Sequence, residues 1–165
     1  MSDRRVTLDA ALVWVDAAAL EHTLAPLVAA PRAADPAIEM LDAAAPQVLH
    51  LYRGPFLAGE SGKALYMPMR NRLDGRFQRF ALRLGEHWES RREWQRAAGL
   101  YQRVVELDPL AETFYRRQMA CLGTQGLRAE AIEVYRRCRQ MLSVTLGVAP
   151  TSETDAAYRR LLTSF

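Results

Sequence analysis

The sequence predicts an all-α protein, a right-handed array of about seven helices with a short extended arm before it. Three observations predict this class. Apolar residues recur at helical spacing between glycine and proline breaks, two stretches match at a separation of 34 residues, and little of the chain alternates as strands do. The composition is that of a soluble globular protein, because half of the 165 residues are apolar and a quarter are charged.

The first third of the chain predicts an arm and two helices. Residues 6–15 alternate weakly, which favours one or two short strands or an extended arm. Helical spacing then predicts a helix over 16–30 that tolerates Pro26, and a second over 35–52 that Pro46 is expected to break or bend.

A loop ends the second helix. Gly54 and Pro55 stop it, because glycine takes the left-handed conformation readily and proline cannot continue a helix. We expect Phe56 and Leu57, which follow, to tuck into the core. Five further helices are predicted over residues 64–90, 93–107, 109–122, 127–146 and 151–162.

The clearest pattern is an internal repeat. Ala97 and Tyr101 recur 34 residues later as Ala131 and Tyr135, at the small and aromatic positions of the second helix of a tetratricopeptide repeat. A small residue lets two antiparallel helices approach closely, and the aromatic residue one turn later fills the gap beside it. Because two repeats alone are marginal, we expect the first two helices and the last to cover the open ends. The other repeat positions are Leu84, Gly85, Trp88, Val104 and Pro109, then Gln118, Met119, Leu122 and Cys138.

The net charge of +3 hides an uneven distribution. Residues 1–60 carry four basic and eight acidic side chains, whereas residues 61–165 carry 18 basic and 11 acidic ones. Lys63 is the only lysine, so nearly all basic side chains are arginines, and the chain has 26 alanines. This composition is better explained by a GC-rich genome than by a ligand that arginine would bind. Charge alone therefore names no partner.

Several kinds of site are not expected. Cys121 and Cys138 are predicted to be buried, reduced thiols, and no histidine stands at metal-ligand spacing. Residues 59–63 lack the glycine and the hydroxyl residue of a phosphate loop. No catalytic arrangement stands out, so we expect no enzyme, no metal and no cofactor. The absence of a signal peptide or a long apolar run predicts a cytoplasmic protein without membrane contact.

Ordered motifs along the chain resemble one bacterial family. They are Val13-Trp14-Val15-Asp16, Leu51-Tyr52-Arg53-Gly54-Pro55-Phe56-Leu57, Leu107-Asp108-Pro109-Leu110-Ala111-Glu112, Gly126-Leu127-Arg128-Ala129-Glu130-Ala131 and Leu146-Gly147-Val148-Ala149-Pro150. In order and spacing the chain is similar to the bacterial transcriptional activator domain (BTAD), which accompanies a winged-helix DNA-binding domain in antibiotic-regulatory activators. We divide the chain into an arm or remnant of a domain junction at 1–15 and this domain at 16–165.

The resemblance implies a tetratricopeptide-like fold and a regulatory role through contacts with other protein domains, the transcription machinery among them. Nothing resembles a recognition helix, so we expect no specific DNA binding by this chain alone and expect it to act with a DNA-binding domain outside this sequence. A homo-oligomer stays open. The alternatives are a general adaptor unrelated to transcription and a small-ligand sensor with a pocket between the repeats and the first helices.

Arginines supply the candidate binding surface. Arg72, Arg76, Arg79 and Arg83 follow one face of the long helix. In the repeat register two of them, with two from the next repeat, fall on or beside positions that line the concave groove. Such a groove suits an acidic peptide, a carboxy terminus or the acidic first segment of this chain, and a solvated face is the alternative. The candidate groove residues are Arg79, Arg83, Arg116 and Arg117.

Two other residue groups are expected to be structural. Arg136, Arg137 and Arg139 are expected to face water rather than nucleic acid, because aromatic residues beside them are few. We expect Trp14, Trp88 and Trp94 to pack in the core rather than hold a ligand.

Overall fold

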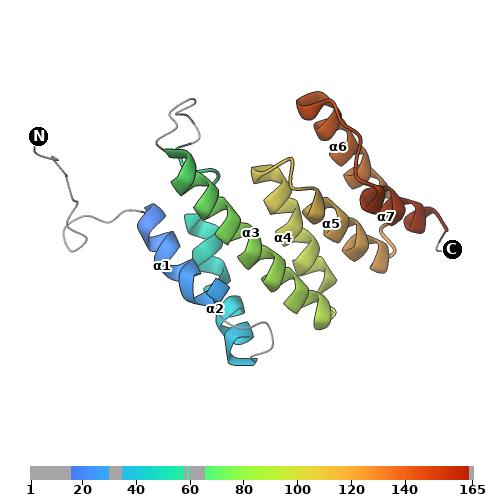
Figure 1. Ribbon diagram of the computed structural model, residues 1–165. Coiled ribbons are helices and arrows are strands. Elements are labelled where there is room, and N and C mark those ends of the chain that lie inside the picture. The colour runs from blue at the N-terminus through green and yellow to red at the C-terminus, as the bar shows by residue number, and fades with distance from the viewer. Residues whose placement is uncertain (1–15, 30–34, 58, 60–65, 164–165) are drawn as a thin grey trace, which may run out of the picture. The chain divides into compact units, whose positions relative to one another are not determined.

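A computed structural model describes residues 16–29, 35–57, 59 and 66–163 of the chain. These residues form seven α-helices and no strand, which confirms the predicted all-α helical array (Figure 1). The predicted arm at 1–15 lies outside the described residues. The helices are α1 (Asp16–Ala29), α2 (Asp35–Leu51), α3 (Met67–Ser90), α4 (Trp94–Leu107), α5 (Glu112–Thr124), α6 (Arg128–Leu146) and α7 (Ser152–Thr163).

The chain divides into two compact units, Met1–Phe77 and Gln78–Phe165. The first unit contains α1, α2 and the beginning of α3. The second contains the rest of α3 and α4 to α7, and therefore both predicted repeats.

The first unit has an apolar core to which each of its helices contributes. Leu24 of α1 and Val48 of α2 are fully buried, and α1 and α2 pack against each other. The ring of Tyr52 stacks on that of Phe77 in α3, with 3.7 Å between the centroids. Its hydroxyl donates a 3.0 Å hydrogen bond to the Asp74 carboxylate, so this buried polar group is satisfied.

Of the two effects predicted for Pro46, the break is wrong, and the bend stays a prediction. Helix α2 continues through Pro46 to Leu51, just as α1 continues through Pro26. A proline inside a helix removes one backbone hydrogen bond, and burial of Ala45 and Val48 beside it offsets this loss.

The loop after α2 does not bury both of its apolar residues as predicted. Phe56 is half-buried, but Leu57 is 39% exposed and has a φ of +52°. The cause is Arg70 of α3, whose guanidinium donates to the carbonyl oxygens of Phe56 at 2.8 Å and Leu57 at 2.5 Å. The predicted tuck is therefore wrong for Leu57, because Arg70 holds the loop backbone instead.

The first repeat packs as its sequence predicts. Ala97, Tyr101 and Leu84 are almost fully buried. A Cβ at Gly85 would overlap the ring of Tyr101, so only glycine lets α4 approach α3 this closely. Trp88 is buried as expected, and the Arg96 guanidinium lies 4.2 Å from its ring centroid.

Of the other two tryptophans, only Trp94 lies in the described part of the chain. Trp94 is half-buried at the start of α4, and Trp14 lies outside the described residues.

The second repeat buries most of the corresponding positions, but Leu122 and Tyr135 are only half-buried. Ala131, Cys138 and Met119 are fully buried, and even Gln118 is only 7% exposed. Tyr135 stacks on a tyrosine of α7 at 4.0 Å and donates a 2.7 Å hydrogen bond to an α7 carboxylate. The repeat register therefore holds in both copies.

One of the helices starts later than predicted. The helix predicted from residue 109 begins at Glu112, because Asp108 and Pro109 form a turn. In it the Leu110 amide donates to the Asp108 carboxylate at 3.2 Å, and the Ala111 amide donates to the Asp108 carbonyl at 3.1 Å. The predicted start at residue 64 lies outside the described residues, and the described part of α3 begins at Met67.

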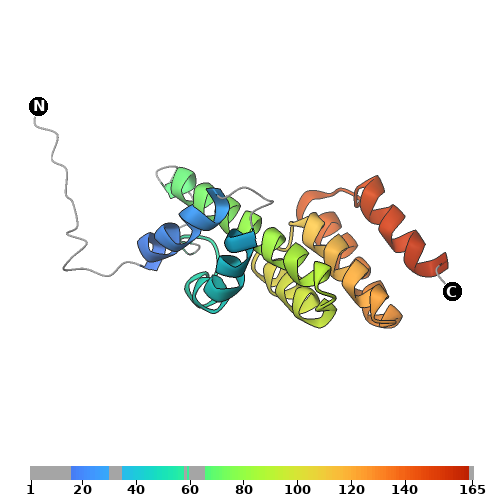
Figure 2. The same ribbon diagram turned by 90° about the horizontal axis from the view of Figure 1, so that it is seen from below.

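The last helix packs on the two before it. Gly147 ends α6 in the left-handed conformation, with a φ of +69°. Helix α7 then contacts both α5 and α6, and Figure 2 shows it in red at the carboxy-terminal end of the repeat region. This placement agrees with the expectation that the final helix covers an open end of the repeats.

Candidate partner-binding surface

The four candidate arginines lie on α3 and α5. Arg79 is exposed and Arg83 is half-buried, one turn apart on α3. Arg116 and Arg117 are adjacent on α5, and both are half-buried. The structure brings Arg116 and Arg117 into ion pairs with other helices.

Arg117 is held by two carboxylates of α3. Its guanidinium forms ion pairs with Glu86 and Glu89, the latter at 3.0 Å. The Tyr101 hydroxyl donates to the other oxygen of Glu89 at 2.6 Å. Burial and this hydrogen bond raise the pKa of Tyr101, so its hydroxyl stays protonated. The network joins α3, α4 and α5 and leaves Arg117 engaged within the protein.

Arg116 faces a different helix. Its guanidinium donates to the buried Thr154 hydroxyl at 3.2 Å and pairs with Glu153 at 3.2 Å, both on α7. Beside it, Glu112 accepts hydrogen bonds from the Thr151 amide at 2.8 Å and hydroxyl at 2.7 Å. Arg116 therefore belongs to a polar cluster where α5 meets the start of α7.

Glu112 is ionised more readily than an ordinary glutamate. Burial alone would raise its pKa, but hydrogen bonds from Thr154 and Thr151, together with the Arg116 charge, outweigh burial and lower the pKa. The hollow beside this cluster has a volume of about 390 Å³ and is lined by Arg116, but not by Arg79, Arg83 or Arg117.

The remaining arginines of α3 pair within the first unit. Arg76 and Arg72 form ion pairs with Glu21 of α1 at 2.9 and 3.1 Å. Glu21 of the acidic first segment thus pairs with two arginines that are not among the four groove candidates, for which this segment was considered. Arg79, by contrast, meets no carboxylate among the residues that the structure describes.

The three arginines in the middle of α6 face solvent as expected. Arg136, Arg137 and Arg139 are all exposed, and Arg136 pairs with Glu133 on its own helix.

The two cysteines are buried free thiols, as predicted. Burial is the main cause that raises the pKa of Cys121 and of Cys138 to about 12 each. Such thiols are poor nucleophiles and poor metal ligands. In the described part of the chain no group of three or more histidine, cysteine, aspartate or glutamate residues could hold a metal ion.

Two further expectations concern loops and membranes. The segment at 59–63, rejected as a phosphate loop, lies outside the described residues except for Gly59. Among the described helices, none has both the length and the apolar character that a membrane span needs.

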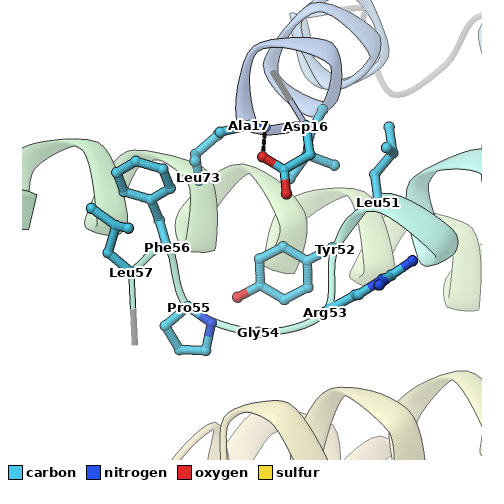
Figure 3. A pocket seen from close by; sticks show the side chains of 11 residues that line it. Asp16, Ala17, Leu51, Tyr52, Arg53, Gly54, Pro55, Phe56, Leu57 and Leu73 are labelled. Carbon is cyan, nitrogen blue, oxygen red and sulfur yellow. Dashed lines mark hydrogen bonds between the residues drawn. The ribbon is translucent and has the colours of Figure 1, made fainter. Parts of the chain in front are cut away.

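A hollow of about 300 Å³ lies within the first unit, beneath the start of α1. Figure 3 shows Tyr52, Phe56 and Leu73 around it, with Asp16 at its edge. At this edge the Asp16 carboxylate accepts a hydrogen bond from the Ala17 amide at 2.7 Å.

The second unit is defined by paired helices that repeat every 34 residues and are joined by ion pairs between neighbouring helices. This is the class of tetratricopeptide-like helical arrays, whose surfaces hold other proteins.

A family model, described as the bacterial transcriptional activator domain, matches residues 15–162 of the chain. The chain belongs to this family, and is thus a module of the kind associated with bacterial transcription regulators. Comparisons with curated proteins and with solved structures found no match.

Some residues of the polar surface were missed by sequence reasoning. Glu86 and Glu89 are three residues apart on α3, and Glu112 and Thr154 are far apart in sequence. The spacing of Glu86 and Glu89 was a usable signal, because it places two acids on one helix face opposite the next repeat. Thr154 carried no comparable signal.

Proposed function

We propose that the chain is a non-enzymatic protein-interaction and regulatory module of a bacterial transcription regulator, which acts together with a DNA-binding domain outside this sequence. The family match over residues 15–162 is the observation that carries the proposal. Its partner is a protein: a neighbouring domain of a larger regulator or a component of the transcription machinery.

The partner surface that we propose is centred on Arg79 and Arg83. Arg79 is exposed on α3 and lies outside the ion pairs that hold Arg116 and Arg117 to neighbouring helices. Arginine pairs well with carboxylates, so an acidic segment of the partner suits this face. Arg116 and Arg117 contribute to this surface indirectly, because their ion pairs hold α5 against α7 and α3.

A tethering assay tests the proposal. The full chain is fused to an unrelated DNA-binding domain. The operator of that domain is placed upstream of a reporter promoter in a bacterium. We expect reporter transcription above the level that the DNA-binding domain gives alone. No change in transcription would contradict a role in recruiting or contacting the machinery.

Charge reversal then tests the surface. Arg79→Glu is the better single variant, because glutamate at Arg116 would face Glu112 and Glu153 and disturb the fold. We expect Arg79→Glu to reduce reporter transcription. Arg139→Glu, the same change at an exposed residue of α6, is the matched control and should leave it unchanged. Equal activity of both variants would remove the Arg79 surface from the proposal.

Direct DNA binding is tested with the isolated chain. We expect no shift of a specific DNA duplex at physiological salt, because specific readout needs side chains placed in a groove. A salt-resistant, sequence-dependent shift would overturn this part of the proposal.

A further inference from the structure

The loop after α2 leaves its apolar side chains only partly buried. Pro55 and Phe56 are half-buried, and Leu57 is 39% exposed. All three line the hollow of about 300 Å³ beneath the start of α1, together with the buried side chains of Leu20 and Leu73. The first unit therefore has an apolar hollow that the side chains of this loop surround without filling.

Arg70 holds the loop in this position. Its guanidinium donates to the carbonyl oxygens of Phe56 and Leu57. Leu57 has a φ of +52°, a left-handed conformation that leucine seldom adopts. Such a conformation persists only where the surrounding structure enforces it, and the two bonds from Arg70 do so here. Leu57 thus stays at the rim of the hollow.

The lining determines what can occupy the hollow. At about 30 Å³ each, about ten water molecules would fill it. Its leucine, proline and phenylalanine side chains offer such waters no hydrogen bonds, so replacing the waters by an apolar group is favourable. The charged residues of the lining, Asp16 and Arg53, are exposed. The hollow therefore suits a large, uncharged, mainly apolar side chain.

The chain carries such a side chain directly before α1. Asp16 and Ala17, which begin α1, lie on one side of the hollow and the loop lies on the other (Figure 3). Trp14 precedes Asp16 by two positions, a distance of at most about 7 Å along the chain. In an extended segment, side chains two positions apart point to the same side, so Trp14 would share the side of Asp16. Trp14 is therefore within reach of the hollow.

We propose that the hollow beneath the start of α1 holds the indole ring of Trp14, packed against Leu20, Leu57 and Leu73. The ring is mainly apolar, and its one N–H group can point to water at the open edge. Because the segment is covalently attached, its effective concentration at the hollow is on the order of millimolar, which favours it over a second copy of the chain.

This inference goes beyond the proposed function, because it assigns a surface of the first unit to the segment before α1 and not to a partner protein. Arg79, on which the proposed partner surface is centred, belongs to the second unit. Either proposal can therefore fail without the other.

Fluorine NMR of the full chain labelled with fluorotryptophan tests the proposal. Trp14→Phe identifies the Trp14 signal among those of the three tryptophans. On transfer from light to heavy water, we expect this signal to shift by less than about half the shift of free fluorotryptophan, because a docked ring contacts little water. A shift equal to that of the free amino acid, or a signal that changes on dilution as docking on a second copy requires, would overturn the proposal.

A variant of the rim shows whether the ring occupies this particular hollow. Leu57→Asn removes an apolar wall but suits the backbone, since asparagine tolerates a positive φ. It should move the Trp14 signal towards that of free fluorotryptophan. Leu162→Asn, at a leucine of α7 that is 41% exposed and does not line the hollow, is the matched control and should leave the signal in place. A Trp14 signal that Leu57→Asn leaves unchanged would mean that the ring is buried elsewhere and would overturn the proposal.

A second measurement needs no substitution and decides the question should Leu57→Asn disturb the first unit. We expect nuclear Overhauser effects between the Trp14 ring protons and the methyl groups of Leu20 and Leu73, because these groups would be in contact. Their absence would overturn the proposal.

Discussion

The Tyr101 hydroxyl on α4 donates a 2.6 Å hydrogen bond to the Glu89 carboxylate on α3, whose second oxygen lies 3.0 Å from Arg117 of α5. One carboxylate thus connects three helices of the repeat region. Glu89 is 17% exposed and Tyr101 is fully buried, so water competes little for these bonds.

Tyr101→Phe should lower the free energy of unfolding by about 1 kcal/mol, because one buried hydrogen bond is lost while the ring and the Arg117 pair remain. Urea unfolding followed by circular dichroism measures this. Tyr158→Phe is the control: the structure shows no hydrogen bond of its hydroxyl with another described residue, and its effect should stay within about 0.5 kcal/mol. Equal stability of Tyr101→Phe and the natural chain would contradict the role given to Glu89.

Gly85→Ala and Gly99→Ala should change stability in opposite directions. Alanine usually stabilises a helix interior by about 1 kcal/mol relative to glycine. Gly99 of α4 has open space at its Cβ position, so Gly99→Ala should stabilise the protein. Gly85→Ala should destabilise it by about 2 kcal/mol, because the new methyl group overlaps the ring of Tyr101. Thermal unfolding compares the two, and a stabilised Gly85→Ala variant would refute the close approach of α3 and α4.

Glu112→Gln should alter how stability depends on pH. The pKa of Glu112 is lowered in the folded state from its ordinary value of 4.5. Its ionisation therefore contributes stability that is fully present above pH 4.5 and is lost as pH falls through the lower folded pKa. The variant should be about 1 kcal/mol less stable at pH 7, and this difference should shrink below pH 4.5.

Urea unfolding at several pH values between 7 and 3 measures this effect. Glu133→Gln removes a carboxylate that is 66% exposed on α6 and should change stability by less than about 0.5 kcal/mol at neutral pH. A difference for Glu112→Gln that is the same at every pH would show that its ionisation is not coupled to folding.

The two thiols should be protected in the native protein. With pKa values of about 12, Cys121 and Cys138 should hold about a thousandfold less thiolate at pH 8 than ordinary cysteines, and burial also blocks access. A disulfide reagent such as Ellman's reagent should label neither thiol quickly without denaturant and both with it. Fast labelling of either native thiol would show that its helix opens readily.

Much of the repeat region could be predicted from the sequence, because helix packing there depends on local spacing. The 34-residue period placed Ala97, Ala131 and Cys138 at contacts between helices, and all three are fully buried. The boundaries were less predictable. Pro109 is favourable at the first turn of a helix, but the Asp108 side chain stabilises a turn there that delays the helix to Glu112.

The candidate surface was less predictable than the fold. Helix periodicity places Arg116 and Arg117 on α5, but their partners depend on how separate helices meet. Arg117 pairs with residues 31 and 28 positions earlier, and Arg116 with a threonine 38 positions later. Such pairs depend on side-chain reach across a packed interface, which spacing within one helix does not reveal. Whether the arginine surface binds a partner stays a prediction.

The opposite directions of Arg116 and Arg117 have a consequence for cooperativity. In a linear array each repeat contacts only its neighbours, so terminal helices can unfold separately. Here two adjacent residues of α5 bind different helices: Arg117 pairs with Glu89 of α3, and Arg116 donates to Thr154 of α7. We expect α3, α5 and α7 to share one hydrogen-exchange protection level, so that a force or ligand acting on the last helix is transmitted back to the long one.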